Sequence, residues 1–453
     1  MAMFVMPDRG TCMRVAASSL YDGLPLVCPL GRNTTLRNHK IFYGYWIVAA
    51  CFFCALVGNG SCMGIFAVFV KVLHEKMGWS RTEIMAGFTI YVVISAIVSP
   101  MVGRIVDRRG APLVIGSGGL LSASGLILLG LMTRLWHFYL GHALIGIGAV
   151  AAGPVVLSYV VSRWFVRRRG MAMGIMSMGM AASGLVFGPL IAVVAIPLLG
   201  PGNAYLAMAL INLLVFTSLS MFVIKTTPGE MGLRPDGITI EVSHIEDARS
   251  RARSRNSGTR DLSLRQAMAT PAFWIMGIYL IFHHVYVGVL QNVYAYLSDM
   301  GFSAGIGSLV IGLSSLAASG GMFLFGWLSD RMKAKHAAAL GLGLIVAGIA
   351  ILFNIRPSSS IQWLWLYSLL IGLGMGCWLP TMSALISSTF GMISYGAIFG
   401  IMSFFQYSGA SIGPLLTGYL YDTTHSYRPA FAVIMMFELI AMVLVLANRP
   451  PKR

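Results

Sequence analysis

Charged residues are scarce in this sequence. Asp, Glu, Lys and Arg make up only 10% of its 453 residues, whereas soluble domains carry about 25%. A water-soluble protein of this length would have too little polar surface to cover its core. The composition therefore excludes an ordinary soluble protein and indicates that lipid surrounds part of the chain.

Motifs of enzymes and metal sites are also missing. No phosphate-binding loop is present, HEKMG (74–78) lacks the second histidine of a zinc-protease helix, and the carboxylates do not cluster. The six cysteines have no zinc-type or disulfide spacing and are interpreted as small apolar residues. We therefore expect no catalytic residue, no metal and no cofactor. A membrane enzyme is a weak alternative, and so is a sensor, because the sequence has no sizeable extramembrane domain.

Long apolar runs dominate the sequence instead. It is 57% hydrophobic, and many runs reach the roughly 20 residues that cross a bilayer as a helix, without the alternation of strands. They predict an all-α membrane protein with twelve transmembrane helices. The expected spans are 42–72, 82–106, 111–132, 136–165, 170–199, 202–225, 272–298, 304–328, 336–354, 361–389, 395–420 and 428–448.

The distribution of basic residues predicts the orientation in the membrane. The formal net charge is +17, and 26 of the 32 Lys and Arg fall on one side of the expected spans. Because cytoplasmic loops are enriched in Lys and Arg, both termini are expected in the cytoplasm. The bilayer is thus the expected partner, and nucleic acid is not, since no basic groove with interleaved aromatic residues lies outside the membrane.

Segments outside the spans divide the chain. Residues 1–40 have no sustained period and are expected to form a disordered cytoplasmic arm, and 449–453 a cytoplasmic tail. A basic, flexible cytoplasmic linker (226–268) separates one six-helix bundle (41–225) from a second one (269–448).

The two bundles repeat each other. Three pairs of motifs recur in the same order at offsets of 223 to 226 residues: GRIVDRRG (103–110) with GWLSDRMK (326–333), LIGIG (144–148) with LIGLG (370–374), and SGLVFGPL (183–190) with SGASIGPL (408–415). Small residues are common in membrane helices, but their order at nearly one offset indicates a duplicated unit. Four prolines inside spans are expected to bend helices or to be tolerated there: Pro154, Pro189, Pro380 and Pro414.

These motifs resemble those of the major facilitator superfamily. GRIVDRRG is similar to its loop motif between helices 2 and 3, HALIGIG (142–148) to its helix-4 motif, and the SG-x-x-x-GP runs to its helix-5 and helix-11 glycine pattern. The resemblance covers about residues 41–448. It implies two pseudo-symmetric six-helix bundles, with a substrate site between them that faces either side of the membrane alternately.

A narrower resemblance concerns the substrate. RWFVRRRGMAMGIMSMG (163–179) resembles the helix 4–5 signature of monocarboxylate porters, and YGYWIV (43–48) resembles the helix-1 entry of a bacterial branch that includes oxalate/formate exchangers. It implies a monomeric carrier in a bacterial inner membrane that moves a small organic acid by proton symport or anion exchange. The signature positions are Phe165, Arg167, Arg168, Arg169 and Gly174.

The resemblance also gives the repeated Gly-x-x-x-Asp-Arg a role. In the superfamily the motif's aspartate faces the positive N-terminus of a helix from the opposite half, and nearby arginines complete the cluster. Such a contact is weak enough to act as a latch that opens in each cycle, and the glycines allow close helix approach. The plainer interpretation is a set of positive-inside anchors. The residues are Gly103, Asp107, Arg108, Gly326, Asp330 and Arg331.

Polar side chains inside the spans are candidate solute or proton sites, because they are unfavourable in lipid. His284 and Gln291 are seven residues apart and share one helix face, and a histidine here is a candidate for a coupling proton, although simple hydrogen bonding within the bundle is the alternative. Glu438 lies on the peripheral twelfth span, where we expect a surface or interhelix contact rather than coupling. The cavity candidates are Asn59, His142, His283, His284, Gln291, Asn292, Trp378, Gln406 and Tyr407.

The eighth span departs from the carboxylate-transporting relatives. These commonly place an arginine in the cavity there, whereas residues 304–328 contain no basic residue. His142 stands where the superfamily's helix-4 motif usually has arginine. A second substrate class therefore stays open: a hydrophobic or weakly polar compound, exported by the same fold.

Overall fold

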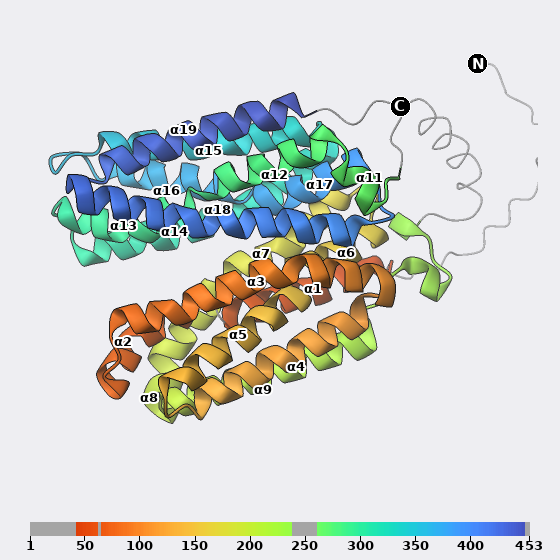
Figure 1. Ribbon diagram of the computed structural model, residues 1–453, viewed down its shortest axis with the longest axis horizontal. Helices are drawn as coiled ribbons and strands as arrows, with labels where there is room; N and C mark the ends of the chain where they lie inside the picture. The colour runs from red at the N-terminus through yellow and green to blue at the C-terminus, as the bar shows by residue number, and fades with distance from the viewer. Residues whose placement is uncertain (1–41, 62–64, 238–260, 449–453) are drawn as a thin grey trace, which may run out of the picture. The chain divides into compact units, whose positions relative to one another are not determined.

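The computed structural model describes residues 42–61, 65–237 and 261–448, and all regular structure in them is helical. The expected arm and tail, and most of the expected linker, lie outside the described residues. The compact unit that begins at Phe42 contains both bundles (Figure 1). The first bundle consists of α1 (Gly44–Asn59), α2 (Ile65–Met77), α3 (Arg81–Arg109), α4 (Ala111–Gly130), α5 (Leu135–Ala151), α6 (Pro154–Trp164), α7 (Arg169–Pro189), η2 (Leu190–Ala195), α8 (Ile196–Leu199), α9 (Pro201–Ser218) and η3 (Leu219–Val223).

The second bundle follows two short 3₁₀ turns, η4 (Pro228–Met231) and η5 (Pro235–Gly237). It consists of α11 (Leu264–Met268), α12 (Pro271–His284), α13 (Val287–Asp299), α14 (Ala304–Arg331), α15 (Ala334–Asn354), α16 (Gln362–Met375), α17 (Trp378–Phe390), α18 (Tyr395–Thr424) and α19 (Arg428–Ala447). Each expected span coincides with one of these helices or with consecutive helical segments.

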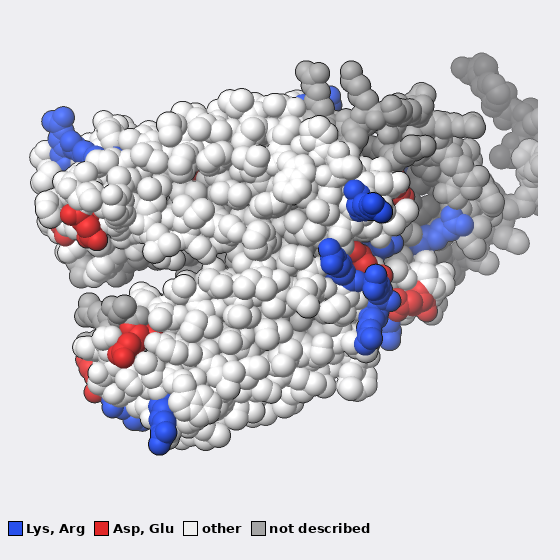
Figure 2. All heavy atoms as spheres, in the orientation of Figure 1, with Lys and Arg blue, Asp and Glu red and all other residues white. Residues whose placement is uncertain are grey.

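Ten helical runs in the described residues are long and apolar enough to cross a membrane. The two expected spans that are not among them correspond to α1 with α2, where residues 62–64 are not described, and to α18, which has 30 residues. On the face that Figure 2 shows, charged side chains gather toward the two ends of the bundles, and the surface between them is almost without charge. An all-helical fold, with helices long and apolar enough to cross a membrane, is therefore confirmed for the described residues.

Helices within a bundle meet through small residues. A side chain on Gly125 of α4 would meet the carbonyl oxygen of Gly141 in α5, and one on Gly341 of α15 would meet the side chain of Cys377 beside α17. Lipid tails are as apolar as leucine, so apolar contact alone does not draw membrane helices together, and close backbone approach supplies the packing instead.

Among the helices whose whole length is described, three expected spans are broken near their middle, at the junctions α5/α6, α12/α13 and α16/α17. The prolines explain part of this. Pro154 begins α6 rather than bending a continuous helix, and Pro380 lies in the first turn of α17, where a missing N–H is tolerated. Pro189 ends α7 just before the π-helical turn η2, and Pro414 lies inside α18. Pro100, inside α3, was not singled out from the sequence.

An aromatic cluster joins the start of α1 to the end of α6. The indole Nε1 of Trp164 donates a hydrogen bond to the carbonyl of Lys225 at 2.9 Å, and its ring lies 5.7 Å from that of Tyr43 and 5.9 Å from that of Phe42. Phe165 contacts Phe42 and Tyr45 edgewise or tilted. The motifs YGYWIV and RWF, which are 120 positions apart, therefore form one contact.

Trp164→Ala is expected to destabilise the fold. The side chain is fully buried, and truncating a buried Trp typically costs about 3–5 kcal/mol. Thermal unfolding of the detergent-purified protein measures the loss. Trp136→Ala is the matched control, because the Trp136 side chain is 55% exposed and should leave the midpoint nearly unchanged. Equal midpoints for the two variants would contradict this role of Trp164.

Candidate functional site

Two aspartates join the bundles at one end, which we call the motif end. The carboxylate of Asp107 in α3 accepts hydrogen bonds from the backbone N–H of Gly396 (3.1 Å) and Ala397 (2.8 Å), in the first turn of α18. The carboxylate of Asp330 in α14 accepts from Gly170 (2.6 Å) and Met171 (2.8 Å), in the first turn of α7. The first N–H groups of a helix lack intrahelical partners and carry its positive dipole end. Each bundle thus holds a helix N-terminus of the other.

Glycines allow this approach. A side chain on Gly103 would overlap the carbonyl oxygen of Gly396, and one on Gly326 would overlap that of Gly170, so α3 and α18, and likewise α14 and α7, cross backbone to backbone. Ser99 adds a bond within the first crossing, because its hydroxyl donates to the carbonyl of Gly400 at 2.8 Å. The two crossings are equivalent under the internal repeat.

The cations near the aspartates are not those of the motif itself. Arg108 is exposed, and the guanidinium of Arg331 lies over the Trp327 ring, 3.8 Å from its centroid. The charges of Arg163 and Arg169 act on Asp107 and Asp330 respectively.

Arg163 was not singled out from the sequence. Its Nη2 donates to the carbonyl of Met392 in the other bundle at 3.0 Å, and its guanidinium lies 5.0 Å from the centroid of the Tyr159 ring. Arg169 stays within its own loop, where it donates to the carbonyls of Phe165 and Ser162. The signature RWFVRRRG therefore supplies one arginine to each crossing.

The described ends of the linker hold two equivalent loops. The carboxylate of Asp236 accepts from the N–H of Val166 (3.0 Å) and of Arg167 (2.8 Å), just before α7. The carboxylate of Asp261 accepts from the N–H of Met392 (2.7 Å), just before α18. At each described end of the linker, an aspartate therefore binds a turn of backbone.

A central cavity of about 130 Å³ lies between the bundles. It is smaller than the roughly 300–1,000 Å³ of drug-sized sites, so its volume suits a small solute. None of the described residues that line it is acidic, basic or a histidine. They are Cys54, Ala55, Gly58, Asn59, Tyr91, Ser122, Ala149, Ala152, Gly153, Pro154, Met180, Phe216, Trp378, Gln406 and Tyr407.

Four cavity candidates from the sequence line this cavity: Asn59, Trp378, Gln406 and Tyr407. The amide of Asn59 donates to the carbonyl of Met180 (3.0 Å) and to the hydroxyl of Ser183 (2.7 Å), which fixes its orientation on α1. The aromatic residues Tyr91 and Phe216 also line the cavity but were not singled out, because the sequence does not show which aromatic residues of a helix face inward.

Three other candidates are placed elsewhere. His142 is buried, with its Nδ1 2.9 Å from the carbonyl oxygen of Phe138 and its ring against that of Phe138. Gln291 is exposed, and the amide of Asn292 donates to the carbonyl of Gly288 in its own helix. The expectation that these side chains line the cavity is corrected for one physical reason: a helix presents only one of its faces to the cavity, and packing decides which.

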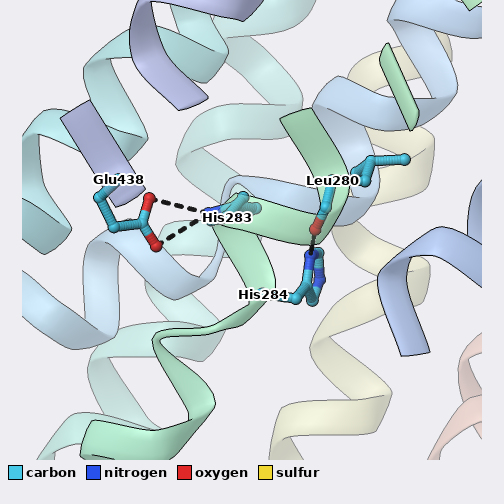
Figure 3. A network of polar contacts seen from close by, with 4 residues as sticks. All are labelled: Leu280, His283, His284 and Glu438. Carbon is cyan, nitrogen blue, oxygen red and sulfur yellow. Dashed lines mark hydrogen bonds and ion pairs between the residues drawn. The ribbon is translucent and has the colours of Figure 1, made fainter. Parts of the chain in front are cut away.

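The histidine pair lies beside the cavity rather than in its lining. Both histidines are buried at the end of α12 (Figure 3). The Nδ1 of His284 lies 3.0 Å from the carbonyl oxygen of Leu280, and its ring centroid is 5.8 Å from that of Trp378, which lines the cavity. His283 points the other way and contacts the carboxylate of Glu438 in α19. Glu438 therefore makes an interhelix contact, which was one of the two expected alternatives, and it does not lie on the surface.

Comparison with known proteins places this arrangement in a family. A family model described as Major Facilitator Superfamily matches residues 48–414. The chain belongs to the major facilitator superfamily. It is therefore an integral multi-pass membrane protein and a secondary transporter, not an enzyme.

Solved structures agree with this membership at the level of the fold. A proton:xylose symporter of the superfamily, XylE bound to 6-bromo-6-deoxy-D-glucose, matches with a TM-score of 0.70 and 13% identity, over 90% of this chain and 97% of that chain. The human organic anion transporter MFSD10 (TETRAN) matches with a TM-score of 0.65 and 15% identity, over 89% of this chain and 99% of that chain. No curated protein sequence matches this facilitator.

Proposed function

We propose that this facilitator carries a small organic acid across the membrane by alternating access, and that the acid is uncharged when bound. The observation that supports it is the composition of the central cavity, whose described lining supplies amide, phenol and indole groups but no charge. A carboxylate moved out of water without a partner charge loses far more solvation energy than neutral hydrogen bonds return. A protonated acid avoids this loss.

The polar groups of the lining fit such a solute. Gln406 and Tyr407 are neighbours on α18, and Asn59 lies on α1 of the other bundle, so polar groups from both bundles surround the cavity. An acid that carries its own proton needs a hydrogen-bond acceptor and a donor, which an amide supplies together. Trp378 and Phe216 supply apolar surface for the rest of the solute.

A second candidate substrate is an uncharged, weakly polar compound. The same uncharged lining favours it, because a neutral solute meets the wall without any protonation step. The missing cation on α14, where residues 304–328 contain no basic residue, supports this candidate as much as the first. Export and import are both compatible with it.

The orientation in the membrane follows from the basic residues. We propose that the motif end is cytoplasmic, because 26 of the 32 Lys and Arg fall on the side where Asp107 and Asp330 end their helices. In this orientation, the two aspartate contacts that join the motif end correspond to a closed cytoplasmic side.

Transport by the purified full chain in proteoliposomes tests the proposal. The probes are labelled lactate and mandelate, together with their neutral amides lactamide and mandelamide, and protein-free liposomes give the leak. Saturable acid uptake that rises as the external pH falls supports the first candidate, and uptake of the amides alone supports the second. No uptake of any probe would overturn both substrate assignments while leaving the fold and family intact.

Gln406→Leu is expected to weaken the apparent affinity for the transported probe by roughly tenfold. The variant removes one hydrogen bond of about 1–1.5 kcal/mol from the cavity wall while keeping the side-chain size. The concentration dependence of initial uptake measures it. Gln291→Leu is the matched control, since Gln291 is exposed and outside the cavity lining. An unchanged KM for Gln406→Leu would remove Gln406 from the site.

A further inference from the structure

We propose that His283 and Glu438 form a proton-binding site of this carrier, distinct from the central cavity, which takes up one proton and releases it in each transport cycle. The proposal rests on the carrier function above and names the proton as the coupling ion. It gives this facilitator a proton of its own, independent of any proton that the solute brings.

The two side chains contact each other directly and are shielded from solvent. The Nδ1 of His283 lies 3.2 Å from Oε2 and 3.3 Å from Oε1 of Glu438, and both side chains are 0% exposed (Figure 3). His283 lies on α12 and Glu438 on α19, and the two residues are 155 positions apart in the chain. A fully buried carboxyl group is uncommon unless it is paired, and this one faces a base.

The proton count follows from burial. A neutral histidine beside an ionised Glu438 leaves one net negative charge away from water, which is the unfavourable arrangement. One additional proton, on either the imidazole or the carboxyl group, makes the pair neutral overall. The pair therefore holds one proton more while it is buried than it holds when water reaches it, and a change in exposure moves that proton.

The surroundings do not supply another countercharge. The titratable groups on which the charges of this pair act are Tyr279 and Tyr286, near the end of α12, His284 beside them, and Cys377 at the start of α17. The rings of Tyr279 and Tyr286 stack on the His283 ring at centroid distances of 5.8 and 5.3 Å. All four groups are neutral in their ordinary form near pH 7.

The basic residues of the helices around this pair lie near helix ends. Arg428 begins α19, ten positions before Glu438, and Lys335 and His336 lie in the first turn of α15. On α18, the acidic residue Asp422 is in the last turn. Within the described residues, His283 is therefore the group that can neutralise Glu438.

A route for the proton leads toward the cavity. The Nε2 of His283 is buried without a hydrogen-bond partner in the described structure. The His283 ring centroid lies 4.7 Å from that of His284, and the His284 ring lies against Trp378 in the cavity wall. We infer that water entering beside these rings, when the bundles rearrange, connects the pair to the cavity.

The backbone at this point allows such a rearrangement. α12 ends at His284 and α13 begins at Val287, so the histidines sit at the break of this rod. The bonds across the break run from Val285 to Phe282 and from Gly288 to Val285, each three residues back rather than four. Residues at such a break absorb backbone rotation more readily than those inside a regular helix.

Infrared spectroscopy of the full-length protein in lipid tests the site without any solute. Difference spectra between about pH 5 and 9 report protonation of carboxyl and imidazole groups across the range where histidine and raised carboxyl pKa values are found. Exposed histidines change charge in this range as well, so the expected signature of the site is one protonation change that carries bands of both groups and is lost in Glu438→Gln and in His283→Gln. Glu83→Gln and His336→Gln are matched controls that should retain it. His336 is exposed, and Glu83 is partly exposed at the start of α3, where glutamine serves equally in its capping box with Ser80.

A wild-type protein with no such protonation change would overturn the proposal, and so would a change that persists in Glu438→Gln. Either result concerns the proton site alone, because it does not depend on which solute is carried. A permanently shared proton, the expected behaviour of a purely structural pair, gives the first of these results.

Transport of a neutral probe gives a second readout. A pH gradient acts on lactamide only through a proton that the protein carries, so an inward gradient of about one pH unit should accumulate lactamide by up to roughly tenfold. Glu438→Gln should abolish this accumulation, and Glu83→Gln should retain it. Downhill lactamide uptake that no pH gradient accelerates would contradict the coupling role, whereas absence of all probe transport would count against the proposed substrate class instead.

Discussion

Replacing Gly326 by alanine is expected to slow transport by fivefold or more. A methyl group there would overlap the carbonyl oxygen of Gly170 in the other bundle, so α14 and α7 must separate. Overpacking of this kind typically costs about 1–3 kcal/mol, which corresponds to roughly 5- to 150-fold in the population of the closed motif end. Helix propensity alone would predict the opposite effect, because replacing glycine by alanine inside a helix normally stabilises the fold by about 0.5–1 kcal/mol.

A second glycine of the same helix provides the control. Gly320 lies six residues earlier in α14 and has open space where a side chain would be added. Initial rates of probe uptake in proteoliposomes, normalised to folded protein, compare the two variants. Gly320→Ala should match or exceed the wild type. Equal rates for Gly326→Ala and Gly320→Ala would show that the crossing of α14 and α7 does not limit transport.

Removing both aspartate charges at the motif end is expected to cause the other large decrease in the transport rate. Asparagine retains the size of the side chain in Asp107→Asn and Asp330→Asn but loses the charge and one of two acceptors for backbone N–H groups. Contacts of this type are worth about 1–2 kcal/mol each when half-buried, or roughly 5- to 30-fold in an equilibrium. The two contacts use different helix pairs and share no hydrogen-bond partner, so the double variant should approach the product of the single effects.

The kinetic signature separates a latch from a binding role. Neither aspartate lines the central cavity, so kcat should fall while KM for the transported probe changes little. Asp422→Asn, an exposed aspartate near the end of α18, should change neither constant. Equal losses in kcat and in apparent affinity for Asp107→Asn would argue that the residue acts on the solute or on folding, and not on opening and closing.

The helical rods and their duplication are predictable from sequence because both arise from composition along the chain. Apolar length alone predicts a span, and the repeated glycines and aspartates occur at nearly constant offsets. The breaks at α5/α6, α12/α13 and α16/α17 are not predictable in the same way, because hydrophobic residues continue across them. Pro154, at the start of α6, and Pro380, in the first turn of α17, mark two of these points in the sequence, and no proline marks the α12/α13 break.

The aspartate contacts of the candidate site were predictable from sequence, whereas the cavity positions were predictable only in part. The partner of Asp107 was implied by the resemblance, and Gly103 and Gly326, which allow the close approach, were already visible in the repeated motif. A cavity position depends on how a helix is rotated when it packs, so Gln406 and the exposed Gln291 are indistinguishable from sequence. An interhelix contact of Glu438 was one of the two expected alternatives, but its partner His283 was not predictable, because the facing residue depends on how α12 and α19 pack.

A reversible cross-link between the bundles tests the central claim, that the motif end opens in every transport cycle. The hydroxyls of Ser162 in α6 and Ser383 in α17 lie 3.3 Å apart across the two bundles, so cysteines at both positions reach disulfide geometry with small side-chain rotations. In a background without the six native cysteines, oxidation of Ser162→Cys/Ser383→Cys should stop probe uptake, and a reductant should restore it, with no effect on either single variant. Full transport by the oxidised, cross-linked protein would contradict alternating access through this end.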